Sequence, residues 1–438
     1  MRVYADNAAT TKLSAAAKEA MLPYFDEIYG NPSTLYTLGQ EAAEHLLACR
    51  TEIAQLIGAA DPREIVFTSG GSEADNQAIV SAAENGARKG KKHLISTKFE
   101  HHAVLHTLDK LRRQGFEVTL LDVHEDGVVR VEDVAAAIRD DTALVSVMFA
   151  NNEIGTLQPI QAIGALCRER GIPFHTDAVQ AIGHVPVDVQ AMNIDLLSCS
   201  AHKFHGPKGI GALYIRKGVK IDPLIHGGAQ ERGHRAGTEN LPGIVGLGKA
   251  IELAEEGLAE NAARMTFLRN RLISGLTAAI PNMRINGTMD KRLPNNVNVS
   301  FAGIEGEAVL LRLDLEGIAA SSGSACTAGS LDPSHVLTAI GLWLGSRPME
   351  VPWYLIPLGF CPTWFQSSDY FPLFPNLGYF LLGAVLGRAL YAEKKSLLPR
   401  ENPPAKALQW MGRKSLLIYL LHQPILAAVV GAIAMIKG

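Results

Sequence analysis

The chain has 438 residues, which is more than one average hydrophobic core accommodates, so we expect two or three domains. Its formal net charge of -3 is unevenly distributed, since residues 1–342 are net acidic and residues 343–438 are basic and apolar. The acidic part carries no basic stripe interleaved with aromatic residues, which argues against nucleic acid as a partner. No charged segment followed by an apolar one opens the chain, so we expect a cytoplasmic protein without a cleaved secretion signal.

Cysteine spacing excludes two further classes of protein. The five cysteines show no Cys-x-x-Cys pattern, so neither a zinc site nor a disulfide framework is expected, and we predict no bound metal. Four of them are expected to be ordinary buried thiols. The five cysteines are Cys49, Cys167, Cys199, Cys326 and Cys361.

Short apolar runs alternate with amphipathic stretches between residues 64 and 216. This alternation predicts an α/β fold with a mostly parallel sheet and helices on both faces, including helices over 72–89 and 160–170. In such folds the functional groups lie on loops at the carboxyl ends of the strands. The predicted strands cover residues 65–68, 94–97, 118–122, 143–150, 173–177, 196–200 and 211–215.

The chain beyond this sheet indicates further units. Residues 225–238 are rich in glycine, arginine and histidine and predict a long functional loop. A helical pattern follows over 241–277, with room for a break, and then a strand over 295–301 and a helix over 307–315. We therefore predict an N-terminal arm with a large domain, an incomplete small α/β domain, and a hydrophobic helical tail. Their boundaries are 1–250, 251–342 and 343–438.

The tail contains long stretches without charge. Residues 351–368 and 416–436 have no charged side chain, and residues 374–391 have one, Arg388. The last stretch reaches the roughly 20 residues that span a bilayer. The basic loop before it is expected in the cytosol, and three spans would also keep the N-terminal part there. The sequence thus predicts either a membrane tether through residues 351–436 or no insertion at all.

Lys203 and Asp177 each follow a predicted strand. Pyridoxal phosphate (PLP) needs an amine that holds it as a Schiff base and an acid beside its ring nitrogen. A buried lysine has the lowered pKa that this chemistry uses, and a buried carboxylate needs a partner such as a pyridinium. Lys203 with Lys208 is alternatively a solvated basic face, and Asp177 is alternatively a helix cap. The two together favour a PLP site.

Three other motifs lie at predicted strand ends. The Gly70-Gly71-Ser72 turn opens a helix, whose free amides suit a phosphate, although Ser72 is equally an ordinary N-cap. One of the adjacent His101 and His102 could stack on a cofactor and move protons. The Asn151-Asn152 amides could bond the phenolic oxygen of PLP, or simply form a turn.

Cys326 lies in the small-residue segment Ser321-Ser-Gly-Ser-Ala-Cys-Thr-Ala-Gly-Ser330. A flexible tether suits a nucleophile that reaches a substrate and then leaves carrying sulfur. A lone cysteine is more often an inert thiol, but its setting here favours catalysis.

Taken together, the motifs resemble the cysteine desulfurases of the NifS/IscS type, a fold-type I family of PLP-dependent transferases within aminotransferase class V. The resemblance covers residues 2–341. It rests on Tyr4-Ala-Asp-Asn-Ala-Ala-Thr-Thr11, Gly30-Asn-Pro-Ser33, Thr68-Ser-Gly-Gly-Ser-Glu73, Glu100-His101, Asn151-Asn-Glu-Ile-Gly155, His175-Thr-Asp-Ala-Val-Gln180, Ser200-Ala-His-Lys203, Arg235-Ala-Gly-Thr238 and Ser322-Gly-Ser-Ala-Cys326.

The resemblance implies a role for each residue. Lys203 would be the Schiff-base lysine, Asp177 the partner of the ring nitrogen, and His101 the stacking acid and base. Gln180 and Asn152 would bind the phenolic oxygen. The phosphate would be held by Gly71, Ser72, Ser200 and His202, and in a homodimer by Thr238 of the other subunit.

The implied reaction converts L-cysteine to L-alanine. The Cys326 thiolate would attack the substrate sulfur and keep it as a persulfide, and an acceptor such as an iron-sulfur scaffold protein would then take the sulfur. Lys203 and His101 would move the protons. The spacing around Cys326 is similar to that of family members with a long, mobile cysteine loop.

The chain departs from the family pattern after residues 335–341. There the family carries an arginine that clamps the substrate carboxylate, in a Ser-x-Arg-x-Ser-x-Gly context, and Arg347 in Gly-Ser-Arg-Pro does not match it. Loss of a bidentate contact to a carboxylate costs a few kcal/mol. A second interpretation is therefore a PLP-binding protein, truncated or fused, that turns cysteine over poorly.

The tail from residue 369 resembles the last spans of bacterial proteins related to heparan-α-glucosaminide acetyltransferase. The resemblance rests on Asp369-Tyr-Phe-Pro-Leu-Phe-Pro and on Gly412-Arg-Lys-Ser-Leu-Leu-Ile-Tyr-Leu-Leu-His422. It covers a fragment that lacks the earlier spans. A remnant of a membrane acyltransferase with a passive N-terminal part is the third and least favoured interpretation.

Overall fold

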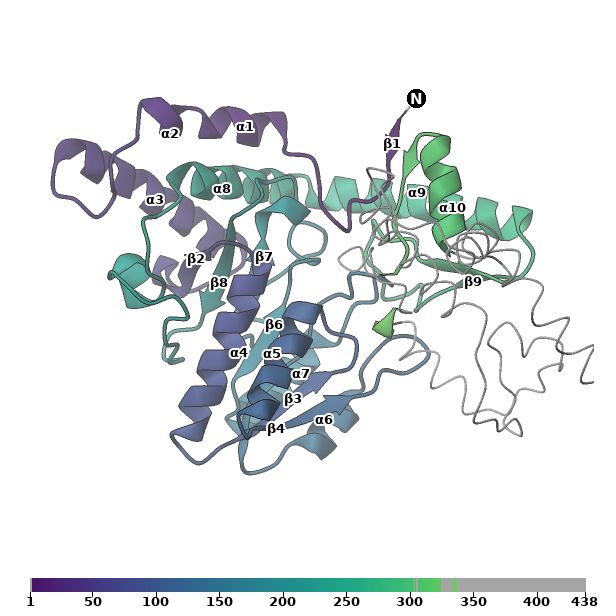
Figure 1. Ribbon diagram of the computed structural model, residues 1–438, viewed down its shortest axis with the longest axis horizontal. Coiled ribbons are helices and arrows are strands. Elements are labelled where there is room, and N and C mark those ends of the chain that lie inside the picture. The colour runs from purple at the N-terminus through teal and green to yellow at the C-terminus, as the bar shows by residue number, and fades with distance from the viewer. Residues whose placement is uncertain (1, 303, 305, 324–333, 337–438) are drawn as a thin grey trace, which may run out of the picture. The chain divides into compact units, whose positions relative to one another are not determined.

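A seven-stranded sheet organises the fold seen in the computed structural model, which describes residues 2–302, 304, 306–323 and 334–336 (Figure 1). The sheet is mostly parallel, as predicted, and only β8 runs antiparallel to its neighbours β2 and β7. Its strands, in spatial order, are β2 (Ile65–Thr68), β8 (Gly211–Ile215), β7 (Leu196–Ser200), β6 (Phe174–Asp177), β5 (Thr142–Ser146), β3 (His93–Thr97) and β4 (Glu117–Leu121).

Most predicted strands are confirmed within two residues, but the one over 143–150 is shorter. Strand β5 ends at Ser146, although the Val147 and Phe149 amides still bond the carbonyls of His175 and Asp177. The Met148 amide instead donates to the buried Glu100 carboxyl, at 3.0 Å. A side chain therefore interrupts the regular ladder where the site begins.

Helices cover both faces of the sheet. On one face α4 and α5 pack against alternate strand residues such as Val66, Leu94 and Leu144. On the other, α3, α7 and α8 enclose Phe67, Val145 and their neighbours. The helices of this part are α1 (Ala15–Met21), α2 (Pro23–Asp26), α3 (Thr37–Leu56), α4 (Gly71–Ala87), α5 (His102–Arg113), α6 (Val131–Ala137), α7 (Ile160–Arg170) and α8 (Leu241–Glu256).

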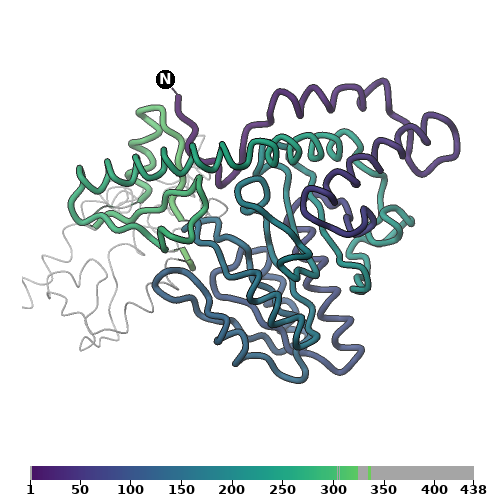
Figure 2. The backbone as a smooth tube through the Cα atoms, turned by 180° about the vertical axis from the view of Figure 1, so that it is seen from behind, coloured from purple at the N-terminus to yellow at the C-terminus, as the bar shows by residue number. Residues whose placement is uncertain are grey.

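The long helical pattern after the sheet is broken at Gly257, as the sequence predicts, and α9 (Leu258–Ala279) follows α8 (Figure 2). The antiparallel pair β9 (Met283–Ile285) and β10 (Val299–Phe301) and helix α10 (Gly306–Leu315) come next. The observed strand β10 covers only the end of the predicted 295–301. The division of the chain at 250 and 342 stays a prediction.

The N-terminal residues of the chain pair with a strand that follows α10. Strand β1 (Val3–Tyr4) pairs in parallel with β11 (Ile318–Ala319), and the Ala5 amide donates to the Ala319 carbonyl at 2.8 Å. The segment therefore joins the beginning of the chain to the part that precedes Cys326. Residue 326 itself and the predicted membrane tail lie outside the described residues. In the part that the structure describes, no helix is both long and apolar enough to cross a membrane.

Candidate active site

The carboxyl ends of the strands bring the predicted residues together. Asp177 ends β6, and Lys203 follows β7 in a short 3₁₀ turn. His101 is the N-cap of α5, and Gly71 is the first residue of α4 after β2. These segments are far apart in the chain and meet because parallel strands end at one edge of a sheet.

Lys203 is buried, with 7% of its surface exposed. Its Nζ donates hydrogen bonds to the backbone carbonyls of Ala8 and Ala9, at 2.5 and 2.9 Å. Gln180 Nε2 donates to the same Ala8 carbonyl at 2.9 Å. The N-terminal arm thus passes over the site and contacts both the predicted cofactor lysine and the predicted phenolic-oxygen ligand.

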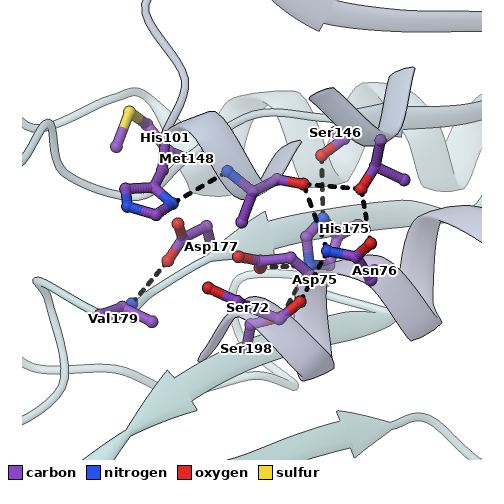
Figure 3. A network of polar contacts seen from close by, with 12 residues as sticks. Ser72, Asp75, Asn76, His101, Ser146, Met148, His175, Asp177, Val179 and Ser198 are labelled. Atoms are coloured by element: carbon purple, nitrogen blue, oxygen red, sulfur yellow. Dashed lines mark hydrogen bonds and ion pairs between the residues drawn. The ribbon is translucent and has the colours of Figure 1, made fainter. Parts of the chain in front are cut away.

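Asp177 and His101 lie close to each other (Figure 3), and the charge of Lys203 acts on both. The Val179 amide donates to Asp177 Oδ1 at 2.9 Å, and burial raises the pKa of Asp177 to about 6. His101 Nδ1 accepts from the Ala103 amide at 3.1 Å. Burial and the nearby charge of Lys203 lower the pKa of His101 to about 4. At neutral pH the ring is therefore neutral, with its proton on Nε2, the arrangement that a proton carrier needs.

Asp75 is a residue of this site that sequence reasoning missed. It lies in the first turns of α4 and is 1% exposed, and burial and the charge of Asp177 raise its pKa well above the usual value. The neighbouring His175 bonds Ser146 and Ser198, at 2.9 and 3.0 Å (Figure 3). Two adjacent buried carboxyls cannot both ionise easily. We assign the proton to Asp75 and the negative charge to Asp177.

The side chains of Asp75, His101 and Asp177 could also be considered as metal ligands. Each offers one ligand atom, and the three atoms lie within 4.8 Å of one another. A protonated Asp75 leaves only one carboxylate and one imidazole, which is a weak set for a divalent cation. An ionised Asp177 would instead suit a protonated ring nitrogen of a cofactor, and the neutral imidazole of His101 would suit stacking and proton transfer.

The start of α4 provides the expected place for a phosphate. The N-cap is Gly70, so Ser72 lies inside the first turn and the interpretation of Ser72 as an N-cap is wrong. A Cβ on Gly71 would lie 2.6 Å from Val179 Cγ2, and one on Gly70 would lie 3.7 Å from Ser200 Oγ. A side chain at position 71 would force Val179 to shift, and the free amides at the start of a helix suit an anion.

The remaining predicted residues have different positions. His202 follows Ser200, and its Nδ1 lies 3.0 Å from Thr10 Oγ1. Asn152 is half-buried in the turn after Asn151. The Asn151 side chain donates through Nδ2 to the Phe99 carbonyl, and its Oδ1 accepts from two backbone amides of the turn. Thr238 is exposed, and its contact with a second subunit stays a prediction.

The donors and acceptors present fit PLP. The buried amine and the buried carboxylate lie at the carboxyl ends of the neighbouring strands β7 and β6, and the free amides at the start of α4 follow the carboxyl end of β2. When bound, PLP supplies an electron sink for a bond broken at the substrate α-carbon.

Glu100 allows a test of the electrostatics of this region. Its carboxyl is fully buried and accepts hydrogen bonds from Thr97 Oγ1 at 2.6 Å and from the Met148 amide at 3.0 Å. Burial raises its pKa from 4.5 to about 8. A raised carboxyl pKa stabilises the fold most at low pH, and this contribution is lost as the pH rises through 8.

We expect Glu100→Gln to remove this dependence. Between pH 5 and pH 8 the free energy of unfolding of the wild type should fall relative to the variant, by up to about 1.4 kcal/mol per pH unit. Urea unfolding of both proteins at pH 5, 6.5 and 8 measures the difference. Parallel pH profiles would show that Glu100 is ionised in the fold.

Comparisons with known proteins agree with this geometry. The family model for aminotransferase class V matches residues 3–344, and that for the catalytic region of heparan-alpha-glucosaminide N-acetyltransferase matches residues 328–424. The chain is 59% identical over 343 residues to the cysteine desulfurase IscS of Clostridium botulinum strain Hall. The aligned residues make up 78% of this chain and 86% of that protein.

Two solved structures are also similar. One is a NifS-like protein, with a TM-score of 0.73 and 42% sequence identity. The superposed residues make up 78% of this chain and 90% of the NifS-like protein. The other is SspA in complex with cysteine, with a TM-score of 0.69 and 40% sequence identity. There the superposed residues make up 78% of this chain and 94% of SspA. The chain belongs to aminotransferase class V, and its fold is the one found in these similar structures. Within that class, the chain belongs to the cysteine desulfurase family.

Proposed function

We propose that this protein is a PLP-dependent cysteine desulfurase that converts L-cysteine to L-alanine and holds the sulfur as a persulfide on Cys326. The observation that carries the proposal is the group formed by the buried Lys203 and Asp177 and the half-buried His101 at the carboxyl end of the sheet. Relatives named as cysteine desulfurases, and a similar structure solved with cysteine, support the choice of substrate.

Each residue has a physical basis for its role. Lys203 Nζ, already near two carbonyls, would hold the cofactor and then exchange protons at the substrate α-carbon. Asp177, the ionised member of the buried carboxyl pair, would keep a positive charge on the ring nitrogen. His101, with its proton on Nε2, would donate to or accept from the substrate sulfur.

The cofactor contacts follow the same geometry. Gly71 and Ser72 in the first turn of α4, with Ser200 at the end of β7 and His202 in the turn after it, would bind the phosphate. Gln180 and Asn152 would bind the phenolic oxygen. Gln180 now donates to the arm carbonyl of Ala8, so the arm and the cofactor would share this side chain.

A homodimer belongs to the proposal. Large apolar side chains of the N-terminal helices and of the loop between them are more than half exposed, which a second subunit would cover. They are Leu22, Phe25, Tyr29, Leu35, Tyr36 and Leu47. Thr238 is also exposed and would reach the phosphate of the partner.

A sulfur acceptor, such as an iron-sulfur scaffold protein, would complete the cycle. The cytoplasmic location and the tether through residues 351–436 remain part of this proposal.

The second candidate is a PLP-binding protein with poor turnover. It is favoured by the missing carboxylate-clamping arginine after residue 341, where the sequence turns apolar. The two candidates share the cofactor site and differ in the handling of cysteine. Alanine formation separates them.

The test uses Cys326→Ala. Without the thiol the enzyme should still bind PLP and show its visible absorbance, but should form no persulfide and release alanine at least about 10²-fold more slowly. Alanine is measured by chromatography, and bound sulfur by cyanolysis. Cys49→Ala is the matched control, because burial raises the pKa of that thiol to about 11 and keeps it unreactive.

Full activity in Cys326→Ala would contradict the assignment of the sulfur carrier. Normal PLP binding without any alanine in the wild type would select the second candidate.

A further inference from the structure

The outer edge of the sheet is closed by side chains. Strand β2 lies at the edge, so its outward backbone groups have no strand beside them. The Phe67 amide donates to Glu231 Oε2 at 3.1 Å. The Ile65 carbonyl accepts from Arg50 Nη1 at 2.5 Å and from Arg232 Nη2 at 2.9 Å.

Arg50 and Glu231 also form a buried bidentate ion pair. Both nitrogen-oxygen distances are 2.7 Å, and the side chains are 4% and 2% exposed. The guanidinium lies 4.6 Å from the centre of the Phe67 ring. A buried pair with this geometry fixes orientation strongly, because both partners lose much if either moves.

The loop that carries Glu231 has an uncommon backbone. Glu231 and Arg232 have φ values of 49° and 58°, in the left-handed region that non-glycine residues rarely adopt. Each such residue costs about 1 kcal/mol or more, and persists only where other contacts impose it. Here the ion pair and the bonds of Arg232 to the Arg63 and Ile65 carbonyls impose it.

A second ion pair joins the end of this loop to the start of α4. Arg235 Nε donates to Glu73 Oε1 at 3.0 Å, and Glu73 Oε2 accepts from the Ser69 amide at 2.8 Å. The Gly237 amide donates to Gln230 Oε1 at 3.0 Å, beside Thr238. These bonds therefore fix the turn before Gly71 and the segment before Thr238 relative to each other.

We propose that Arg50 and Glu231 are positioning residues for the phosphate of the cofactor. Through the edge strand they set the turn that leads to Gly71, and through the loop they set Thr238 for a second copy of this chain. The inference rests on the proposed PLP function and adds to it residues that do not touch the cofactor. It predicts that breaking the pair weakens the binding of the phosphate and leaves the lysine chemistry unchanged.

The experiment compares PLP with pyridoxal, which lacks the phosphate. In Glu231→Gln, and in the double variant Arg50→Met with Glu231→Gln, we expect the dissociation constant of PLP to rise about tenfold or more, as when a residue that orients binding groups is lost. The dissociation constant of pyridoxal should not change. The visible absorbance maximum at saturation should also stay in place, since Lys203 and Asp177 are intact.

Asp195→Asn is the matched control. Asp195 accepts from Arg216 Nε at 2.9 Å and from the Phe174 amide at 3.0 Å, which is the same chemistry at the opposite ends of the strands. It should lower stability without changing the affinity for PLP. If Glu231→Gln does not fold, the double variant decides, because removal of both charges of a buried pair is tolerated better than removal of one.

Wild-type affinity for PLP in the folded Arg50 and Glu231 variants would overturn the inference, as would equal losses for PLP and pyridoxal. Failure of the proposed function gives another result, because wild-type protein would then either bind no PLP through Lys203 or bind PLP and release no alanine from cysteine.

Discussion

Replacement of Lys203 by alanine is expected to abolish the visible absorbance of the PLP-loaded protein and to slow alanine release from cysteine by about 10³-fold or more. The buried amine is the group that would both hold the cofactor and move the α-proton, so a single change removes two functions. Absorbance spectra and alanine release, each measured on purified protein supplied with PLP, test this expectation.

The nearby Lys208 is the matched control. It is exposed and five residues further on, so Lys208→Ala should leave both the spectrum and the rate unchanged. If Lys203→Ala retained the wild-type spectrum, or if Lys208→Ala lost it, the cofactor lysine would be wrongly assigned.

The second large effect is expected for Asp177→Asn. The amide oxygen can still accept from the Val179 amide, so the fold should persist, but the negative charge beside the ring nitrogen is lost. Without that charge the ring withdraws electrons poorly, and we expect kcat for alanine release to fall by about 10³-fold. PLP should remain attached through Lys203 and be visible in the spectrum.

Asp75→Asn provides the comparison. Asp75 carries the proton of the pair, so an amide at this position changes no charge, and the loss of kcat should be about tenfold or less. A larger loss in Asp75→Asn than in Asp177→Asn would reverse the assignment of charge within the pair.

The sequence predicts the sheet and most of the site because both depend on local patterns. Apolar runs mark strands such as β3 and β7, and the polar residues just after a strand mark the edge where Lys203 and Asp177 lie. The strand over 143–150 was predicted too long because its apolar pattern continues. A buried side chain, Glu100, takes the Met148 amide, and no local pattern announces that contact.

Residues that act across long sequence distances were harder to find. Asp75 resembles an ordinary polar residue near a helix start, and only the fold shows that it lies against Asp177. Arg50 and Glu231 are 181 residues apart, and each alone resembles a surface charge. Ser72 resembles an N-cap, but the φ freedom of Gly70 lets the helix begin two residues earlier than a cap at Ser72 would allow.

The N-terminal arm links two parts of the chain that the chemistry needs at different moments. Its first residues pair with β11, which precedes the segment containing Cys326, and its Ala8 and Ala9 carbonyls accept from Lys203. Residues 3–9 therefore contact both the proposed cofactor lysine and the strand that precedes the cysteine-bearing segment. A deletion of these residues would remove both sets of contacts at once, so the beginning of the chain belongs to the proposed active site as well as to the scaffold.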